Sequence, residues 1–329
     1  MKVGIYGASG YAGQDLVEIL ARHPEVEIVF ATSGTYAGEP VPFTNLTYTP
    51  PDQVDLSQVE AVFLALPHKE SAIVAAKGKA AGIKVIDLSA DLRLDDAANY
   101  EAWYKIVHPH PELLTDAPYG LVEVNRQKIN GVDMVAVPGC YPTATLLGLY
   151  PLLQADAIQA DTPIIVDAKS GVSGAGRVPK PNTHFVEVFG NLSPYSPGRS
   201  HRHISEIEQE IHKLNANAGT LIFTPHLVPI DRGLMSSIYV TLKEGFEDPQ
   251  SLYEEVYQNE PLVDVLPAGQ QATFRHAVRK NNCAISLTPV NGRYLHITSV
   301  IDNLRKGAAG QAVQCFNLMM DYPETTGLI

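Results

Sequence analysis

The chain has too few positive charges for a nucleic-acid-binding protein. Its 329 residues hold 24 Lys and Arg against 36 Asp and Glu, a formal net charge of −12 with His neutral. No dense run of Lys and Arg offsets this balance, so DNA, RNA and anionic membrane surfaces are poor candidates for partners. Long apolar runs are also missing, since the best candidate, near 146–153, contains Pro151 and falls far short of the ~20 residues of a membrane span. The first residues lack the apolar core of a signal peptide.

Cysteine is scarce, with only Cys140, Cys283 and Cys315 in the chain. Three widely separated cysteines predict neither a disulfide framework nor a metal site. We therefore expect a reduced, cytoplasmic protein without a metal ion. Charged residues make up only 18% of the chain and hydrophobic residues 45%, which indicates a large interior and a subunit interface. The length is about twice that of a ~100–200-residue domain, which favours two domains.

The first part of the chain alternates strand and helix. A short strand over 1–7 leads into a glycine turn, a helix ending at His23–Pro24 and a second strand over 26–31. The same order continues with a strand over 59–66, a helix over 69–81 and a strand over 84–88. This alternation predicts an α/β domain with a doubly wound parallel sheet of the Rossmann type.

The pattern changes after residue 162. Strand-like runs there lie far apart, and only some of the gaps contain a predicted helix; the runs cover 163–168, 220–223, 236–242, 283–287 and 294–301. Such spacing predicts a second, α+β domain with a mostly antiparallel sheet and helices on one side. The apolar helix predicted over 308–320 must pack on something, and we expect it to return to the first domain.

The glycine turn is the first candidate binding site. Gly7, Gly10 and Gly13 stand between a strand and a helix, where backbone N–H groups can face the pyrophosphate of a nucleotide. The alternative is a tight turn without a ligand. The second strand ends in Thr32 and Ser33 and has no acidic residue to hold ribose hydroxyls, which favours NADP over NAD.

Cys140 is the candidate nucleophile. It lies in Pro138-Gly-Cys-Tyr-Pro-Thr143, before the predicted helix 144–153, so it stands at a helix N-terminus that favours a thiolate and can hold an oxyanion. A buried structural cysteine is the alternative. Cys283 in a strand and Cys315 in the apolar C-terminal helix have the context of core residues.

Two histidines are candidates for the acid and base. His201 and His203 are expected in a loop just before a helix that begins close to Ser205. A His-x-His pair can also bind a metal, but no further ligand motif accompanies it, so metal binding is the minor alternative. His108 has the sequence context of an exposed loop.

Two stretches could bind anions. Arg93 follows the strand 84–88, where a guanidinium could contact a phosphate or carboxylate; a surface ion pair with Asp91 or Asp95 is the alternative. Segment 170–177 is a glycine-rich loop after a strand, but it has neither the lysine nor the spacing of a P-loop, and it could be an ordinary loop.

Seven motifs, in order along nearly the whole chain, carry a family resemblance. They are Gly7-Ala-Ser-Gly-Tyr-Ala-Gly13, Leu88-Ser-Ala-Asp-Leu-Arg93, Pro138-Gly-Cys-Tyr-Pro-Thr143, Ser170-Gly-Val-Ser-Gly-Ala-Gly-Arg177, His201-Arg-His203 with Glu206-Ile207, Thr224-Pro-His-Leu-Val-Pro229 with Arg232-Gly233, and Asn303-Leu-Arg-Lys-Gly-Ala-Ala-Gly-Gln311. The sequence thereby resembles the N-acetyl-gamma-glutamyl-phosphate reductase family of arginine biosynthesis, which is related to aspartate-semialdehyde dehydrogenase.

The resemblance implies an enzyme that uses NADPH to reduce a small acyl phosphate to a semialdehyde through a thioester on Cys140, with His201 as acid and base. It implies substrate contacts by Arg93, Tyr195, His203 and Ser170. It implies cofactor contacts by Gly7, Ser9, Gly10, Tyr11, Gly13, Thr32, Ser33, Pro67, Ser173, Gly174 and Asn303. The predicted domains are 1–145 with the C-terminal segment 304–329 for NADP, and 146–303 for catalysis and assembly into a homodimer or homotetramer.

The alternative hypotheses of function differ in which of these residues they require. Related reductases act on aspartyl phosphate or on a carrier-linked aminoadipyl phosphate with nearly the same motifs. A non-catalytic NADP-binding regulator would keep the glycine turn but leave Cys140 unreactive. A thiol hydrolase would keep Cys140 and His201 and make the glycine turn unnecessary.

Overall fold

The computed structural model describes all residues 1–329 and divides them into two compact units. The first unit is Met1–Gly139 with Ala308–Ile329, and the second is Cys140–Gly307. The predicted domain limits were 145 and 304, so Cys140, predicted in the first domain, lies in the second compact unit. None of the helices combines the length and apolar character that crossing a membrane requires.

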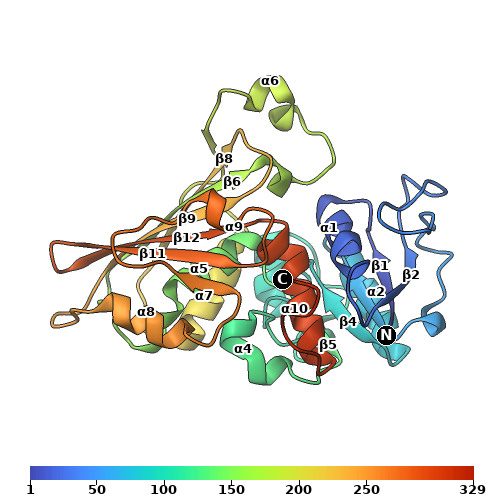
Figure 1. The fold of residues 1–329 in the computed structure, drawn as a ribbon, viewed down its shortest axis with the longest axis horizontal. Coiled ribbons are helices and arrows are strands. Elements are labelled where there is room, and N and C mark those ends of the chain that lie inside the picture. The colour runs from blue at the N-terminus through green and yellow to red at the C-terminus, as the bar shows by residue number, and fades with distance from the viewer. The chain divides into compact units, whose positions relative to one another are not determined.

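The first unit is built on a five-stranded parallel sheet with the order β2-β1-β3-β4-β5 (Figure 1). The strands are β1 (Lys2–Tyr6), β2 (Glu27–Ala31), β3 (Ala61–Leu64), β4 (Lys84–Asp87) and β5 (Met134–Ala136). The helices are α1 (Tyr11–Leu20), α2 (Glu70–Ala80), α3 (Ala97–Tyr104), α4 (Val122–Ile129) and α10 (Gly310–Met319), the last packing on α1 and α4. The Rossmann-type fold class is confirmed.

The sheet order indicates where the first unit would bind a ligand. From β1 the chain passes to β2 on one side, and β3 then pairs with β1 on the other side. Ligands of such sheets bind beyond the carboxyl ends of the strands where the order reverses. The two segments that leave the sheet there are the glycine turn after β1 and the segment 65–69 after β3. β3 is wholly buried, which explains its unbroken apolar sequence.

The second unit is built on a seven-stranded sheet with the order β10-β11-β12-β9-β6-β8-β7. The strands are β6 (Ile164–Gly171), β7 (Ser193–Pro194), β8 (Leu221–Val228), β9 (Leu234–Thr241), β10 (Val263–Val265), β11 (Cys283–Val290) and β12 (Tyr294–Ile301). The helices are α5 (Cys140–Gln154), α6 (Phe185–Val188), α7 (His203–Leu214), α8 (Pro249–Tyr257) and α9 (Phe274–Ala277). Only β10–β11 and β6–β8 pair in parallel, so the predicted, mostly antiparallel sheet is confirmed.

The two faces of this sheet differ. Helix α5 packs closely on one face, because a Cβ at Gly148 would lie 2.6 Å from Cδ1 of Ile238. On the other face, α9 covers one end, where Ala277 packs with Ala284 and Val300. The rest of that face is open, and Ile165, Tyr239 and Tyr294 are exposed on it.

Candidate active site

The glycine turn in the first unit is held by tight backbone packing. Gly7 has φ +72°, and a Cβ added there would lie 2.2 Å from the carbonyl oxygen of Ala65. A Cβ at Gly13 would lie 2.3 Å from the carbonyl oxygen of Gly7. These two glycines are therefore required by the fold itself.

Gly10 differs from its two neighbours. It is the N-cap of α1 with ordinary extended backbone, and a Cβ there would meet only the carbonyl oxygen of Gly7, at 3.5 Å. The fold would tolerate a side chain at this position, so glycine leaves space that a bound group can use. An open position at the start of a helix allows a pyrophosphate to approach the backbone N–H groups. The glycine turn therefore fits a dinucleotide.

The end of β2 supplies hydroxyls to this turn. Oγ1 of Thr32 accepts a hydrogen bond from the backbone N–H of Gly7 (3.2 Å), and Oγ of Ser33 lies 2.8 Å from Oγ of Ser9. Ser33 also accepts a hydrogen bond from the N–H of Tyr36 (3.0 Å). Hydroxyls thus stand where NAD-binding domains usually carry an acidic residue.

Cys140 begins helix α5 in the second unit. It is partly accessible, whereas Cys283 and Cys315 are buried, as their sequence context predicted. A Cβ at Gly307 would lie 2.8 Å from Cβ of Cys140, so the segment after β12 passes directly beside the nucleophile candidate. A position at the N-terminus of a helix favours a thiolate and can stabilise an adjacent oxyanion.

Aromatic rings surround the histidines in the same unit. The ring of Tyr141 meets those of His201, His203 and Phe223 edge-on, with centroids 5.6, 6.0 and 5.3 Å apart. Tyr195 contacts His201 in the same manner at 5.5 Å. The structure thus brings the predicted residues Tyr195, His201 and His203 together around Tyr141, the residue after Cys140.

His201 is held in one neutral form. Its Nδ1 accepts a hydrogen bond from the backbone N–H of His203 (3.2 Å), so the proton of the neutral ring resides on Nε2. Burial and then the positive charge of Arg202 lower the pKa of His201 to about 4. The imidazole is therefore neutral at pH 7 and can donate a hydrogen bond from Nε2.

The helix after the histidines begins earlier than the sequence indicated. α7 starts at His203 with Arg202 as its N-cap, so the prediction that both histidines precede a helix beginning near Ser205 was wrong for His203. The isolated β-bridge between Gly198 and Phe223 holds this segment against β8, and α7 begins shortly after it, at His203.

The glycine-rich loop after β6 is tied to the segment after β12. The side-chain amide of Asn303 donates to Oγ of Ser173 (2.9 Å), and its oxygen accepts from the N–H of Gly233 (2.8 Å). A Cβ at Gly174 would lie 2.8 Å from Oγ of Ser170, itself almost fully buried. Asn303 therefore fixes this loop, and its contact with a cofactor stays a prediction.

Arg93, in the first unit, is buried rather than a surface residue. Its Nε donates to the carbonyl oxygen of Val137 and its Nη2 to that of Leu88, both at 2.7 Å. Two of its donors therefore stabilise the ends of neighbouring strands. Its contact with a substrate stays a prediction.

His108 was expected in an exposed loop, and this was wrong. It is buried, and its Nε2 lies 2.7 Å from the carbonyl oxygen of Asp91. The ring of Tyr100 lies against it, 4.8 Å between centroids. The sequence could not indicate this, because the burying residues belong to α3 and to the segment after β4.

Sequence reasoning gave Tyr141 no role. The only available signal was its position after Cys140 in the first turn of α5. The hydroxyl of Tyr195 donates a hydrogen bond to that of Tyr141 (2.9 Å), a contact between residues 54 positions apart that no local pattern indicates.

Comparison with known proteins identifies the family of both units. The model for the semialdehyde dehydrogenase NAD-binding domain matches residues 2–132, and that for the semialdehyde dehydrogenase dimerisation domain matches residues 140–303. The chain is 47% identical to N-acetyl-gamma-glutamyl-phosphate reductase of Moorella thermoacetica and 45% identical to that of Herminiimonas arsenicoxydans. Each alignment covers 100% of this chain and 98% of the relative.

Solved structures show the same fold at lower identity. Aspartate semialdehyde dehydrogenase II of Vibrio cholerae, in complex with ASA, superposes with a TM-score of 0.77 at 21% identity over 97% of this chain and 98% of that one. The NADP complex of aspartate semialdehyde dehydrogenase from Candida albicans gives 0.69 at 15% identity over 97% of each chain. The chain belongs to the semialdehyde dehydrogenase family, within its N-acetyl-gamma-glutamyl-phosphate reductase branch.

Proposed function

We propose that this protein uses NADPH to reduce N-acetyl-gamma-glutamyl phosphate to N-acetylglutamate 5-semialdehyde and phosphate, a step of arginine biosynthesis. The observation that carries the proposal is that Cys140 begins a helix in the same unit that gathers His201, His203 and Tyr195 around Tyr141. Full-length relatives with 47% and 45% identity carry the name of this reaction. Three free cysteines and a thiol nucleophile are consistent with a reducing compartment such as the cytoplasm.

Cys140 performs the first step. Its thiolate attacks the acyl carbon, the C–O bond to phosphate breaks, and phosphate leaves with the electron pair, so that a thioester remains on Sγ. Backbone N–H groups at the start of α5 stabilise the oxyanion of the tetrahedral intermediate. An acyl phosphate is already activated, so this step needs no metal ion to assist departure.

His201 serves the second half of the reaction. When bound, a nicotinamide cofactor would supply the hydride that the thioester carbon accepts. The neutral imidazole donates from Nε2 to the oxygen on which negative charge then develops, and the net proton comes from solvent. Collapse of the thiohemiacetal releases the aldehyde and returns the proton to sulfur, which restores Cys140.

The glycine turn would hold the cofactor. Gly10 leaves room for the pyrophosphate. The hydroxyls of Ser9 and Ser33, which stand in place of an acidic residue, support NADP over NAD. Thr32 is fully buried and supports the turn by accepting from the N–H of Gly7. Gly10→Ala is expected to weaken NADPH binding by about tenfold or more while the melting temperature stays that of the wild type. Gly7→Ala is the matched control and is expected to destabilise the fold. Fluorescence titration and calorimetry measure both, and unchanged affinity in Gly10→Ala would contradict the assignment.

The reaction can be tested in reverse. Purified protein is supplied with NADP, phosphate and either N-acetylglutamate semialdehyde or aspartate semialdehyde, and absorbance of the reduced cofactor is followed. We expect faster turnover of the acetylated substrate, and a rate lower by about 10⁴-fold or more in Cys140→Ala. Cys283→Ala is the control and should retain wild-type turnover. Faster oxidation of aspartate semialdehyde would overturn the substrate, and normal turnover by Cys140→Ala would overturn the thioester.

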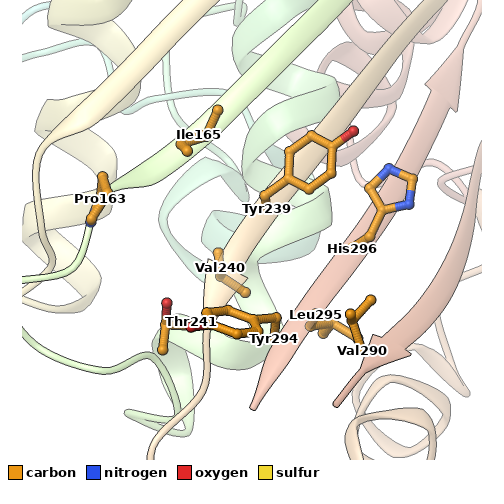
Figure 2. A pocket seen from close by; sticks show the side chains of 9 residues that line it. All are labelled: Pro163, Ile165, Tyr239, Val240, Thr241, Val290, Tyr294, Leu295 and His296. Atoms are coloured by element: carbon orange, nitrogen blue, oxygen red, sulfur yellow. The ribbon is translucent and has the colours of Figure 1, made fainter. Parts of the chain in front are cut away.

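The open face of the second sheet supports assembly of two chains. Tyr239 and Tyr294 are 45% and 52% exposed there, and they border a shallow hollow of about 430 Å³ with Ile165 and Val290. Figure 2 shows the rings of Tyr239 and His296 side by side on neighbouring strands, with centroids 4.7 Å apart. Apolar and aromatic side chains of this kind are typical of homodimer interfaces.

We propose a homodimer formed through this face, two of which can pair into a homotetramer. Tyr239→Asp is expected to yield monomers in sedimentation at micromolar concentration, because it places a charge in the interface. Val107→Asp, at a position 71% exposed in the first unit, is the control and should sediment as the wild type. An unchanged sedimentation coefficient for Tyr239→Asp would exclude this face as the interface.

A further inference from the structure

The hydroxyl pair Tyr141–Tyr195 joins the helix of the nucleophile to the segment of the histidines. Tyr141 is the second residue of α5, directly after Cys140. Tyr195 opens the segment 195–203, which ends in the two histidines. The two hydroxyl oxygens are 2.9 Å apart, a normal hydrogen-bond distance.

Both tyrosine rings also contact His201. Tyr141 is only 3% exposed and meets His201 edge-on at 5.6 Å between centroids. Tyr195 meets the same imidazole at 5.5 Å. His201 therefore lies against two rings whose hydroxyl groups bind each other, so displacement of either ring changes the surroundings of the imidazole.

The electrostatic surroundings include Cys140. Burial, then the neighbouring Tyr195, raise the pKa of Tyr141, and the charge of Cys140 contributes. Burial raises the pKa of Tyr195 to about 12, again with a contribution from Cys140. Both tyrosines thus remain protonated at pH 7, and both are close enough to the sulfur to respond to its charge.

The segment that carries the histidines has an irregular backbone. Ser196 has φ +44° and Gly198 has φ +76°. The N–H of Tyr195 donates to the carbonyl oxygen of Pro225 (3.0 Å), and that of Phe223 donates to Gly198 (3.2 Å). These bonds fix the backbone to β8, whereas the hydroxyl pair fixes the Tyr195 side chain to α5.

We propose that Tyr141 is a positioning residue: its hydroxyl holds the ring of Tyr195 against His201 and so sets the place of the imidazole relative to Cys140. The role rests on the proposed function, since it serves the stabilisation of the reacting oxygen by the Nε2–H group of His201. Tyr141 acts through Tyr195 and His201, without touching the substrate. Misplacement of a catalytic group by about 1 Å can lower a rate by about a hundredfold.

Three variants test the role: Tyr141→Phe, Tyr195→Phe and the double variant. Each removes a hydroxyl and keeps the ring. Tyr253→Phe is the matched control, because its hydroxyl donates to the carbonyl oxygen of Gly148 in the same helix α5 and is fully buried. The measurements are kcat and KM in the reverse reaction, and the pH dependence of alkylation of Cys140 by iodoacetamide, followed by mass spectrometry.

We expect Tyr141→Phe to lower kcat by about tenfold or more with little change in KM. The pH profile of Cys140 alkylation should shift in the same direction in both single variants. The double variant should be no slower than Tyr195→Phe, because the two hydroxyls act as one unit. Tyr253→Phe should lower only the melting temperature.

Three results would overturn the role. They are wild-type kcat in Tyr141→Phe, a loss no greater than that of Tyr253→Phe, or losses that multiply in the double variant. If wild-type protein shows no NADP-linked turnover, the proposed function fails. The alkylation profiles then still decide whether the hydroxyl pair governs the surroundings of Cys140.

Discussion

Each unit contains a buried polar cluster, and the two clusters differ in what surrounds the ionisable groups. In the first unit, Asp87 and Asp91 are fully buried and surrounded by hydrogen-bond donors. Asp91 accepts from the N–H groups of Lys69 and Ala72 (both 2.9 Å) and from the hydroxyl of Tyr100 (2.7 Å). In the second unit, His201 is surrounded mainly by ring edges.

The difference shows how burial can serve structure or reactivity. Burial raises the pKa of Asp87 to about 6, with the charge of Asp91 adding to the effect, and it lowers that of His201 to about 4. Both shifts favour the neutral form, because transfer of a charge out of water is unfavourable for either sign. The carboxylates are occupied by internal donors, whereas the imidazole keeps Nε2–H to offer to a ligand.

Among the changes that compare the two buried clusters, loss of the imidazole should give the largest effect. His201→Asn is expected to lower kcat/KM by about 10²–10³-fold, because the imidazole N–H that stabilises the developing oxyanion is removed. Steady-state kinetics of the reverse reaction measure it. His212→Asn, near the end of α7, is the control. A loss below threefold would show that the ring cluster is structural, like the carboxylate cluster.

Loss of Asp91 should have an effect of nearly the same size in free energy, but on the stability of the fold instead of on the reaction rate. Asp91→Ala leaves two backbone N–H groups at the start of α2 and a tyrosine hydroxyl without their acceptor, at a cost of about 3 kcal/mol in the free energy of unfolding. Lys69, with φ +74°, also loses the bond that holds its strained backbone. Chemical denaturation measures the effect. If Asp91→Ala has the stability of the wild type, these hydrogen bonds make no net contribution to the free energy of unfolding.

The pH dependence of the unfolding free energy should reveal the raised pKa of Asp87. Its pKa is raised on folding, so its favourable contribution is complete below its ordinary pKa and is lost as the pH rises through about 6. Two pKa units correspond to about 3 kcal/mol. Asp87→Asn should therefore remove part of the decline in unfolding free energy between pH 4 and pH 7. Parallel curves for wild type and variant would contradict the shift.

The smallest effect is expected at Arg202. Its charge is the second cause, after burial, of the low pKa of His201. Arg202→Gln should raise the pKa of His201 by up to about one unit, and the acid limb of the kcat/KM profile should move to higher pH with it. Titration of the His201 ring proton by NMR gives the value directly. A fall in that pKa would show that Arg202 acts on it other than by charge.

The strand and helix order of both units could be predicted because it follows from local patterns. The turn Gly7–Gly13 and Cys140 at the start of α5 were also recognisable, since each depends on residues adjacent in the chain. The extent of β8 was underestimated, because Pro225 interrupts its pattern and only pairing with β6 shows that the strand continues. His108 was misjudged because distant residues bury it.

The sequence by itself determined the fold class, the glycine turn and the choice of one cysteine among three, because helix periodicity, turn chemistry and helix termini are local properties. Only the tertiary structure decided that Tyr141 binds Tyr195, that Arg93 bonds to strand ends, and that His201 is neutral with its proton on Nε2. Hydrogen-bond partners and desolvation depend on which distant segments meet, and one-dimensional patterns do not encode those contacts.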